Sequence, residues 1–146
     1  MIILDTNVLI EITAENPNPG VVRWLDEANR ADLWTTAICI FEMEFGVYKR
    51  DEGRRRDEAR AKLDDLITDL LPDRIVAFDH LSAAIAARLF HARQRVGRTV
   101  PERDTFIAGI ALLHQASLVT RNVRHFADLA IDVVNPWGPD DPGPDA

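Results

Sequence analysis

Four polar residues lie at the ends of apolar runs or near the starts of segments with helical periodicity. Asp5 ends the apolar run that begins at Met1, and Asn122 follows the short apolar segment before it. Glu42 and Asp104 lie near the starts of two segments with helical periodicity. In a parallel sheet, the carboxyl ends of the strands and the amino ends of the following helices meet at one edge. The pattern therefore allows these four side chains to converge, although periodicity alone does not establish it.

Such a group of side chains fits the hydrolysis of a phosphodiester bond. This reaction needs a nucleophilic water and neutralisation of charge at the phosphate, and one or two Mg²⁺ ions supply both. Mg²⁺ prefers hard oxygen ligands, and Mn²⁺ can take its place. Asp5, Glu42 and Asp104 are the candidate metal ligands. The hydroxyl groups of Thr6 and Thr120 are candidates for a supporting role.

Each of these residues also has an ordinary structural role open to it. Asp5 or Thr6 could cap the helix that follows, and Asn122 could cap a later short helical segment. Glu42 could face solvent from its helix. Asp104 could favour the helix dipole, because it lies in a first turn. For any one residue alone, these roles compete with catalysis.

Short apolar strands alternate with helices along the chain, which indicates an α/β fold with a mainly parallel central sheet of about five strands. The predicted strands are 1–4, 32–36, 74–78, 117–120 and 131–134. The predicted helices are 7–12, 21–28, 37–49, 50–69, 79–96 and 100–115. No repeat or linker divides them, so residues 1–137 are predicted to form one domain. Residues 138–146 are rich in Pro, Gly and Asp, and we expect this tail to be disordered.

Composition narrows the class of protein. The net charge of −7 over 146 residues argues against nucleic-acid binding by electrostatics alone, but not against contact with phosphate through a bound metal ion. The single cysteine, Cys39, excludes disulfides within the chain and is expected in the core. Neither a signal peptide nor a membrane span is apparent, so we expect a cytoplasmic protein.

With these residues in view, the chain resembles PIN domains, specifically the toxin ribonucleases of the VapC and FitB type. The resemblance extends from Met1 to about Trp137. It is carried by five regions in order: Ile3–Ile10, Thr35–Ile38 with Phe41–Gly46, Arg103–Ala108, Leu118–Asn122 with His125–Phe126, and Val134–Trp137.

The resemblance implies a three-layer sandwich with a parallel sheet and Mg²⁺-dependent endoribonuclease activity. It also implies the role of the toxin in a type II toxin–antitoxin pair, which forms a homodimer and binds a cognate antitoxin in a hetero-oligomer. The family's acids match Asp5, Glu42 and Asp104. Its fourth acidic position falls on Asn122, whose amide can orient water or ligate weakly but cannot act as a carboxylate base.

Two further assignments depend on the resemblance. The family places its glutamate four residues before a helix glycine, which selects Glu42 over its rival Glu44, because Gly46 is that glycine. The expected substrate is RNA, and six arginines are candidates for phosphate contacts. These are Arg103, Arg121 and Arg124, with Arg93, Arg95 and Arg98. The histidines show no metal-ligand spacing, and no catalytic role is assigned to His80, His91, His114 or His125.

Other classes of protein fit less well. A haloacid-dehalogenase-like phosphatase would need an acid where Asn7 stands, and a nucleotide-binding enzyme would need a glycine-rich phosphate loop. The main alternative is a catalytically silent PIN-like module that acts by binding RNA or protein. Metal-dependent cleavage of RNA, measured with and without a chelator, discriminates between these two functions.

Overall fold

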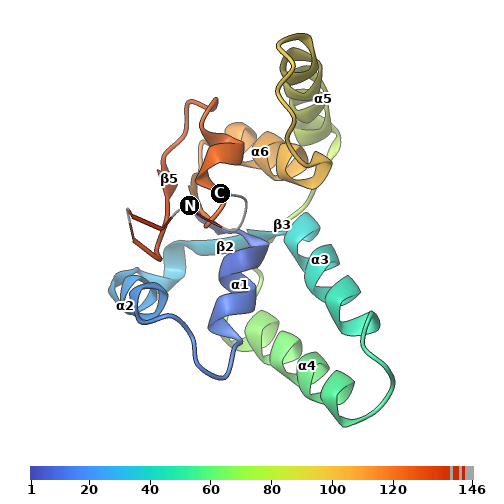
Figure 1. The fold of residues 1–146 in the computed structure, drawn as a ribbon, viewed down its shortest axis with the longest axis vertical. Coiled ribbons are helices and arrows are strands. Elements are labelled where there is room, and N and C mark those ends of the chain that lie inside the picture. The colour runs from blue at the N-terminus through green and yellow to red at the C-terminus, as the bar shows by residue number, and fades with distance from the viewer. Residues whose placement is uncertain (139, 142, 144–146) are drawn as a thin grey trace.

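The computed structural model describes residues 1–138, 140–141 and 143. Its centre is a five-stranded sheet in the order β3-β2-β1-β4-β5, and every neighbouring pair is parallel (Figure 1). The strands are β1 (Ile2–Leu4), β2 (Leu33–Thr36), β3 (Ile75–Val76), β4 (Ser117–Val119) and β5 (Val133–Val134). This confirms the predicted α/β class and the parallel sheet.

Within the described residues, six α-helices flank the sheet. They are α1 (Thr6–Ile12), α2 (Pro19–Glu27), α3 (Ala37–Tyr48), α4 (Arg54–Asp65), α5 (His80–Arg95) and α6 (Glu102–His114). Helix α4 and helix α5 project toward opposite ends of the molecule in Figure 1. No described helix is long and apolar enough to cross a membrane.

The strand order reverses direction at β1, which lies in the middle of the sheet. The chain proceeds from β1 outward through β2 to β3, and then returns to add β4 and β5 on the other side. Leu4 is level with Val119 in the register of β1 and β4, so these two strands end together. Ligands bind at such a point of reversal, beyond the carboxyl ends of the strands. The residues that follow β1 and β4 therefore lie at the expected site.

Buried side chains pack the helices that carry the acids against the sheet and against each other. Ile3 and Leu4 of β1 are fully buried, and so is Cys39 of α3, as predicted. Helix α6 packs closely on α5 at Gly109, where an added Cβ would lie 2.7 Å from the carbonyl oxygen of Ser82. Because no larger residue fits there, Gly109 fixes α6 against α5, and with it the first turn of α6 beside the sheet edge.

Three predicted elements are wrong in their extent, and one of them, the strand expected over 131–134, forms only as Val133–Val134. The single helix expected over 50–69 is α4 followed by a π-helical segment, Leu66–Leu70, and Gly53 precedes α4 with a φ of 133°. This φ is strained for residues with a side chain, so the helix begins only after Gly53. The strand expected over 74–78 forms only as Ile75–Val76, because it pairs with the edge of β2 alone.

The predicted disordered tail, 138–146, lies partly outside the described residues. Within the described part, the carboxylate of Asp141 accepts two hydrogen bonds from the guanidinium of Arg121, at 3.0 and 2.9 Å. This contact joins the tail to the loop that follows β4.

Candidate active site

Asp5 lies at the end of β1 and is also the N-cap of α1, so the two roles considered for it coexist. Its side chain is 2% exposed. Oδ1 accepts a hydrogen bond from the backbone N–H of Thr6 at 2.7 Å. Oδ2 accepts from Asn7 Nδ2 at 2.9 Å and from Thr120 Oγ1 at 2.6 Å. These donors fix the carboxylate at the edge of the sheet.

The environment of Asp5 raises its pKa to about 6. Burial is the largest cause, because it removes water from the charged form. The negative charges of Asp104 and Glu42 raise the pKa further, whereas the hydrogen bonds from Thr120 and Thr6 lower it. Thr6 joins two of these acids, because its backbone N–H donates to Asp5 and its hydroxyl donates to Glu42. The charge of Asp104, on a third segment, also acts on Asp5, so the three predicted acids face one region.

Asp104 lies in the first turn of α6 and is 9% exposed. Its Oδ2 is 2.5 Å from Nδ1 of His125. Burial raises the pKa of Asp104, and His125 opposes this shift through its hydrogen bond and charge. The sequence reasoning assigned no role to His125. The residue stands within the segments that carry the family resemblance, which was the signal available.

Glu42 faces the same region from α3. Its Oε2 accepts a hydrogen bond from Thr6 Oγ1 at 2.5 Å, and its Oε1 accepts from Arg103 Nη1 at 3.2 Å. Glu44 points elsewhere, because its carboxylate is held by Arg60 at 2.7 and 2.6 Å. The structure therefore brings Glu42 to the cluster and keeps Glu44 out of it.

Asn122 follows β4 and lies next to Asp5 through one shared hydroxyl. Its backbone N–H donates to Thr120 Oγ1 at 3.0 Å, and this same hydroxyl donates to Asp5. The side chain makes no cap hydrogen bond to the short helix Val123–Phe126. Its buried Oδ1 has no hydrogen-bond partner among the described residues. A buried acceptor without a donor is costly, so this oxygen favours a ligand such as a cation or a water molecule.

The chemistry of these donors fits a hard divalent cation. The cluster contains the carboxylates of Asp5, Asp104 and Glu42 and the unpartnered oxygen of Asn122. Among the residues that the structure describes, no three Asp, Glu, His or Cys side chains are arranged to enclose an ion by themselves. Mg²⁺ keeps several waters and uses few protein ligands, so it does not require such a cage.

The candidate arginines have different environments. Arg93 is 4% exposed, so the interpretation of this residue as a solvated or phosphate-binding side chain is wrong. Arg103 lies at the cluster, where it pairs with Glu42 and stacks over the exposed ring of Phe41. Arg121 is held by Asp141. Exposed side chains remain at Arg95 and Arg124, and Arg98 is half-buried.

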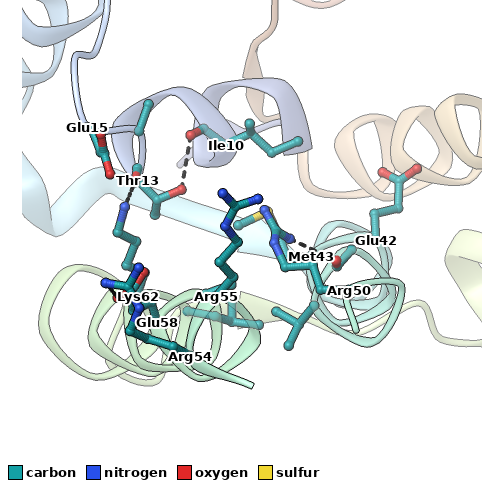
Figure 2. A pocket seen from close by; sticks show the side chains of 15 residues that line it. Ile10, Thr13, Glu15, Glu42, Met43, Arg50, Arg54, Arg55, Glu58 and Lys62 are labelled. Atoms are coloured by element: carbon teal, nitrogen blue, oxygen red, sulfur yellow. Dashed lines mark hydrogen bonds and ion pairs between the residues drawn. The ribbon is translucent and has the colours of Figure 1, made fainter. Parts of the chain in front are cut away.

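A groove of about 800 Å³ lies between α1, α3 and α4 (Figure 2). Glu42 lines this groove, so the groove adjoins the acidic cluster. Its apolar lining includes Ile10 and Met43. Charged side chains of both signs line it as well: the basic Arg50, Arg54, Arg55 and Lys62, and the acidic Glu15 and Glu58.

Comparison with known proteins gives consistent matches over nearly the whole chain. The family model described as "PIN domain" matches residues 2–132. Toxin FitB of Neisseria gonorrhoeae is 34% identical over 94% of this chain and 99% of its own length. VapC ribonuclease Y4jK of Sinorhizobium fredii is 30% identical over 95% of this chain and 99% of its own length. A solved structure of FitAB bound to an IR36 DNA fragment superposes with a TM-score of 0.86 at 33% identity, and it covers 94% of this chain and 96% of the compared chain.

Proposed function

We propose that this chain, which belongs to the PIN domain family, is a Mg²⁺-dependent endoribonuclease and the toxin of a type II toxin–antitoxin pair. Family membership confirms the resemblance read from the sequence. The observation that carries the proposal is geometric: Thr6 bridges Asp5 and Glu42, and the buried Oδ1 of Asn122 beside them has no hydrogen-bond partner among the described residues. The like charges of Asp5, Glu42 and Asp104 also favour a bound cation. Relatives over nearly the whole chain are named as a toxin and as a ribonuclease, which supports this activity.

Asp5 and Asp104 would hold the ion, and Glu42 and Asn122 would complete its surroundings directly or through water. When bound, the ion neutralises the phosphate and activates the attacking water. Thr6 orients Glu42, and Thr120 orients Asp5. This cluster is therefore held before any ligand arrives, which lowers the cost of assembling the site.

Arg103 would position the substrate at the edge of the cluster. Its guanidinium lies 3.2 Å from Glu42 and is about half exposed. The guanidinium could therefore leave the carboxylate of Glu42 and bind an RNA phosphate instead. Guanidinium groups bind two phosphate oxygens at once. Mn²⁺ would also support cleavage in place of Mg²⁺, because both ions take oxygen ligands.

Cleavage of RNA tests the proposal. We expect the wild-type chain to cut RNA with Mg²⁺ or Mn²⁺ and to stop when EDTA removes the ion. Asp104→Asn should abolish cleavage, and Glu44→Gln is the matched control on a carboxylate outside the cluster. Retention of RNA without cleavage in any divalent ion would favour the alternative, a catalytically silent binding module.

The groove beside Glu42 is the proposed binding site of the antitoxin. Its lining of apolar side chains and charges of both signs suits an amphipathic segment, and Glu42 lies where a basic side chain of that segment would pair with the cluster. Such a pair would take the place of the cation. The test is co-expression with a candidate antitoxin, chosen as any small protein whose gene adjoins the gene for this chain. Met43→Glu should weaken the complex, whereas Val22→Glu on α2 should not.

We also propose a homodimer. Helix α3 exposes Phe41, Phe45 and Tyr48 along one face, and each ring is 48–62% exposed. Exposed apolar patches of this kind mark contacts with other proteins, so we assign this face of α3 to a second copy of the chain. Light scattering of the wild type and of Phe45→Lys measures the oligomeric state. A wild-type monomer at all concentrations would refute this assignment.

A further inference from the structure

The loop after β4 joins the two buried acids by a continuous series of hydrogen bonds. Thr120 Oγ1 donates to Asp5 at 2.6 Å and accepts the backbone N–H of Asn122 at 3.0 Å. The carbonyl oxygen of Asn122 accepts the backbone N–H of His125 at 2.9 Å. The imidazole of His125 then contacts Asp104 at 2.5 Å. The loop therefore sets the position of Asp104 relative to Asp5.

A buried guanidinium fixes the far end of this loop. Arg93 reaches in from α5, and its Nη2 donates to the carbonyl oxygen of His125 at 2.9 Å. Its Nη1 donates to the hydroxyl of Thr105 at 2.8 Å, and Thr105 is the neighbour of Asp104 on α6. The carboxylate of Asp128 accepts from Nε and Nη2, both at 2.8 Å. One side chain thus holds both His125 and the residue after Asp104.

This arrangement restricts the His125–Asp104 pair from both sides. A buried guanidinium that lost one of these partners would leave a charge unpaired at low dielectric, so the network favours a single geometry. Of these four hydrogen bonds from Arg93, one goes to the backbone of His125, one to Thr105 of α6 and two to Asp128. The backbone of His125 and the first turn of α6 are therefore held in one relative position.

From this geometry we propose that His125 is a positioning residue for metal binding, anchored by Arg93. It donates from Nδ1 to Oδ2 of Asp104, and it thereby orients the carboxylate so that Oδ1 is offered to the ion. The inference rests on the proposed function, since it concerns the same metal. Partners of this kind behind metal ligands tune affinity, and their loss typically costs about 10–100-fold.

The test compares two substitutions at His125 with one control. His125→Ala removes the donor, whereas His125→Asn places an amide nitrogen near the position of Nδ1. His91→Ala is the control, because His91 is exposed on α5. Calorimetric titration with Mn²⁺ in the absence of RNA gives the affinity, and cleavage rates give kcat and KM for RNA.

We expect His125→Ala to weaken Mn²⁺ binding by about 10–100-fold, with KM for RNA little changed at saturating Mn²⁺. His125→Asn should recover most of the affinity, and His91→Ala should match wild type. Equal Mn²⁺ affinity in wild type and His125→Ala would overturn the proposal. A wild type that binds no Mn²⁺ and cuts no RNA would instead overturn the proposed function.

Histidine side-chain NMR checks the contact without metal or RNA. With ¹⁵N-labelled protein, we expect the Nδ1 of His125 to carry a proton, and its signal to move in Asp104→Asn but not in Glu44→Gln. An Nδ1 without a proton would mean that His125 accepts rather than donates, and the proposal would then fail even if the enzyme is active.

Discussion

Replacing Asp5 by asparagine should stabilise the metal-free protein. The carboxyl group has a pKa of about 6 in the folded chain, against an ordinary value of 3.8. Between these two values the folded state binds more protons than the unfolded state, so stability falls as the pH rises through this window. Above pH 6 the ionised Asp5 lowers the free energy of unfolding by its full amount. A pKa difference of about two units corresponds to about 3 kcal/mol.

The asparagine side chain avoids this cost but loses part of the hydrogen bonding. Its carbonyl oxygen can still accept from Thr6, but the hydroxyl of Thr120 already accepts from Asn7 and from the backbone N–H of Asn122, so it cannot accept from the new amide as well. The hydrogen bonds from Asn7 and Thr120 to Oδ2 are therefore both lost, although Asn7 keeps its bond to Thr120 at 3.1 Å. Each such loss costs about 1 kcal/mol. The net gain is about 1 kcal/mol, which raises Tm by about 2–4 °C in a domain of this size.

Thermal unfolding in EDTA from pH 4 to pH 8 measures the effect. The difference in Tm between Asp5→Asn and wild type should be negative at pH 4, where the lost hydrogen bonds dominate, and should rise to a positive maximum above pH 7. Asp79→Asn is the control, because hydrogen bonds from Ser82 lower the pKa of Asp79 and its contribution has the opposite sign. A difference in Tm that is negative at pH 7.5, or independent of pH, would refute the reasoning. Added Mg²⁺ should stabilise wild type more than Asp5→Asn.

Three further predictions follow from the site. Glu42→Gln should abolish cleavage in initial-rate assays, and Glu44→Gln should stay near wild type; the reverse result would show that the orientation of α3 is misassigned. Asn122→Asp should lower the Mg²⁺ concentration for half-maximal cleavage and shift the acid limb of the pH profile upward, and identical curves would reduce Asn122 to a structural role. Arg93→Met should cost about 3 kcal/mol in denaturant unfolding, because it leaves Asp128 without its main partner; a cost below about 1 kcal/mol would contradict the network.

The order of strands and helices could be predicted from the sequence. Strand β1 is a short apolar run that stops at Asp5, and this pattern is local, so no distant contact is needed to recognise it. The choice of Glu42 over Glu44 came from the family resemblance, which places its glutamate four residues before a helix glycine, here Gly46. In the structure these two glutamates do take different partners.

Only the tertiary structure decided how the acids are held. His125 meets Asp104 across 21 positions of the chain, and Arg93 meets Asp128 across 35. Hydrophobic periodicity describes which face of an element is buried, but it does not say which polar side chain of another element will lie opposite. The sequence alone therefore gave no sign that Arg93 is buried. In the structure, the packing of α5 on α6 buries this side chain. Burial and long-range pairing, which also raise the pKa of Asp5, arise only when these segments come together.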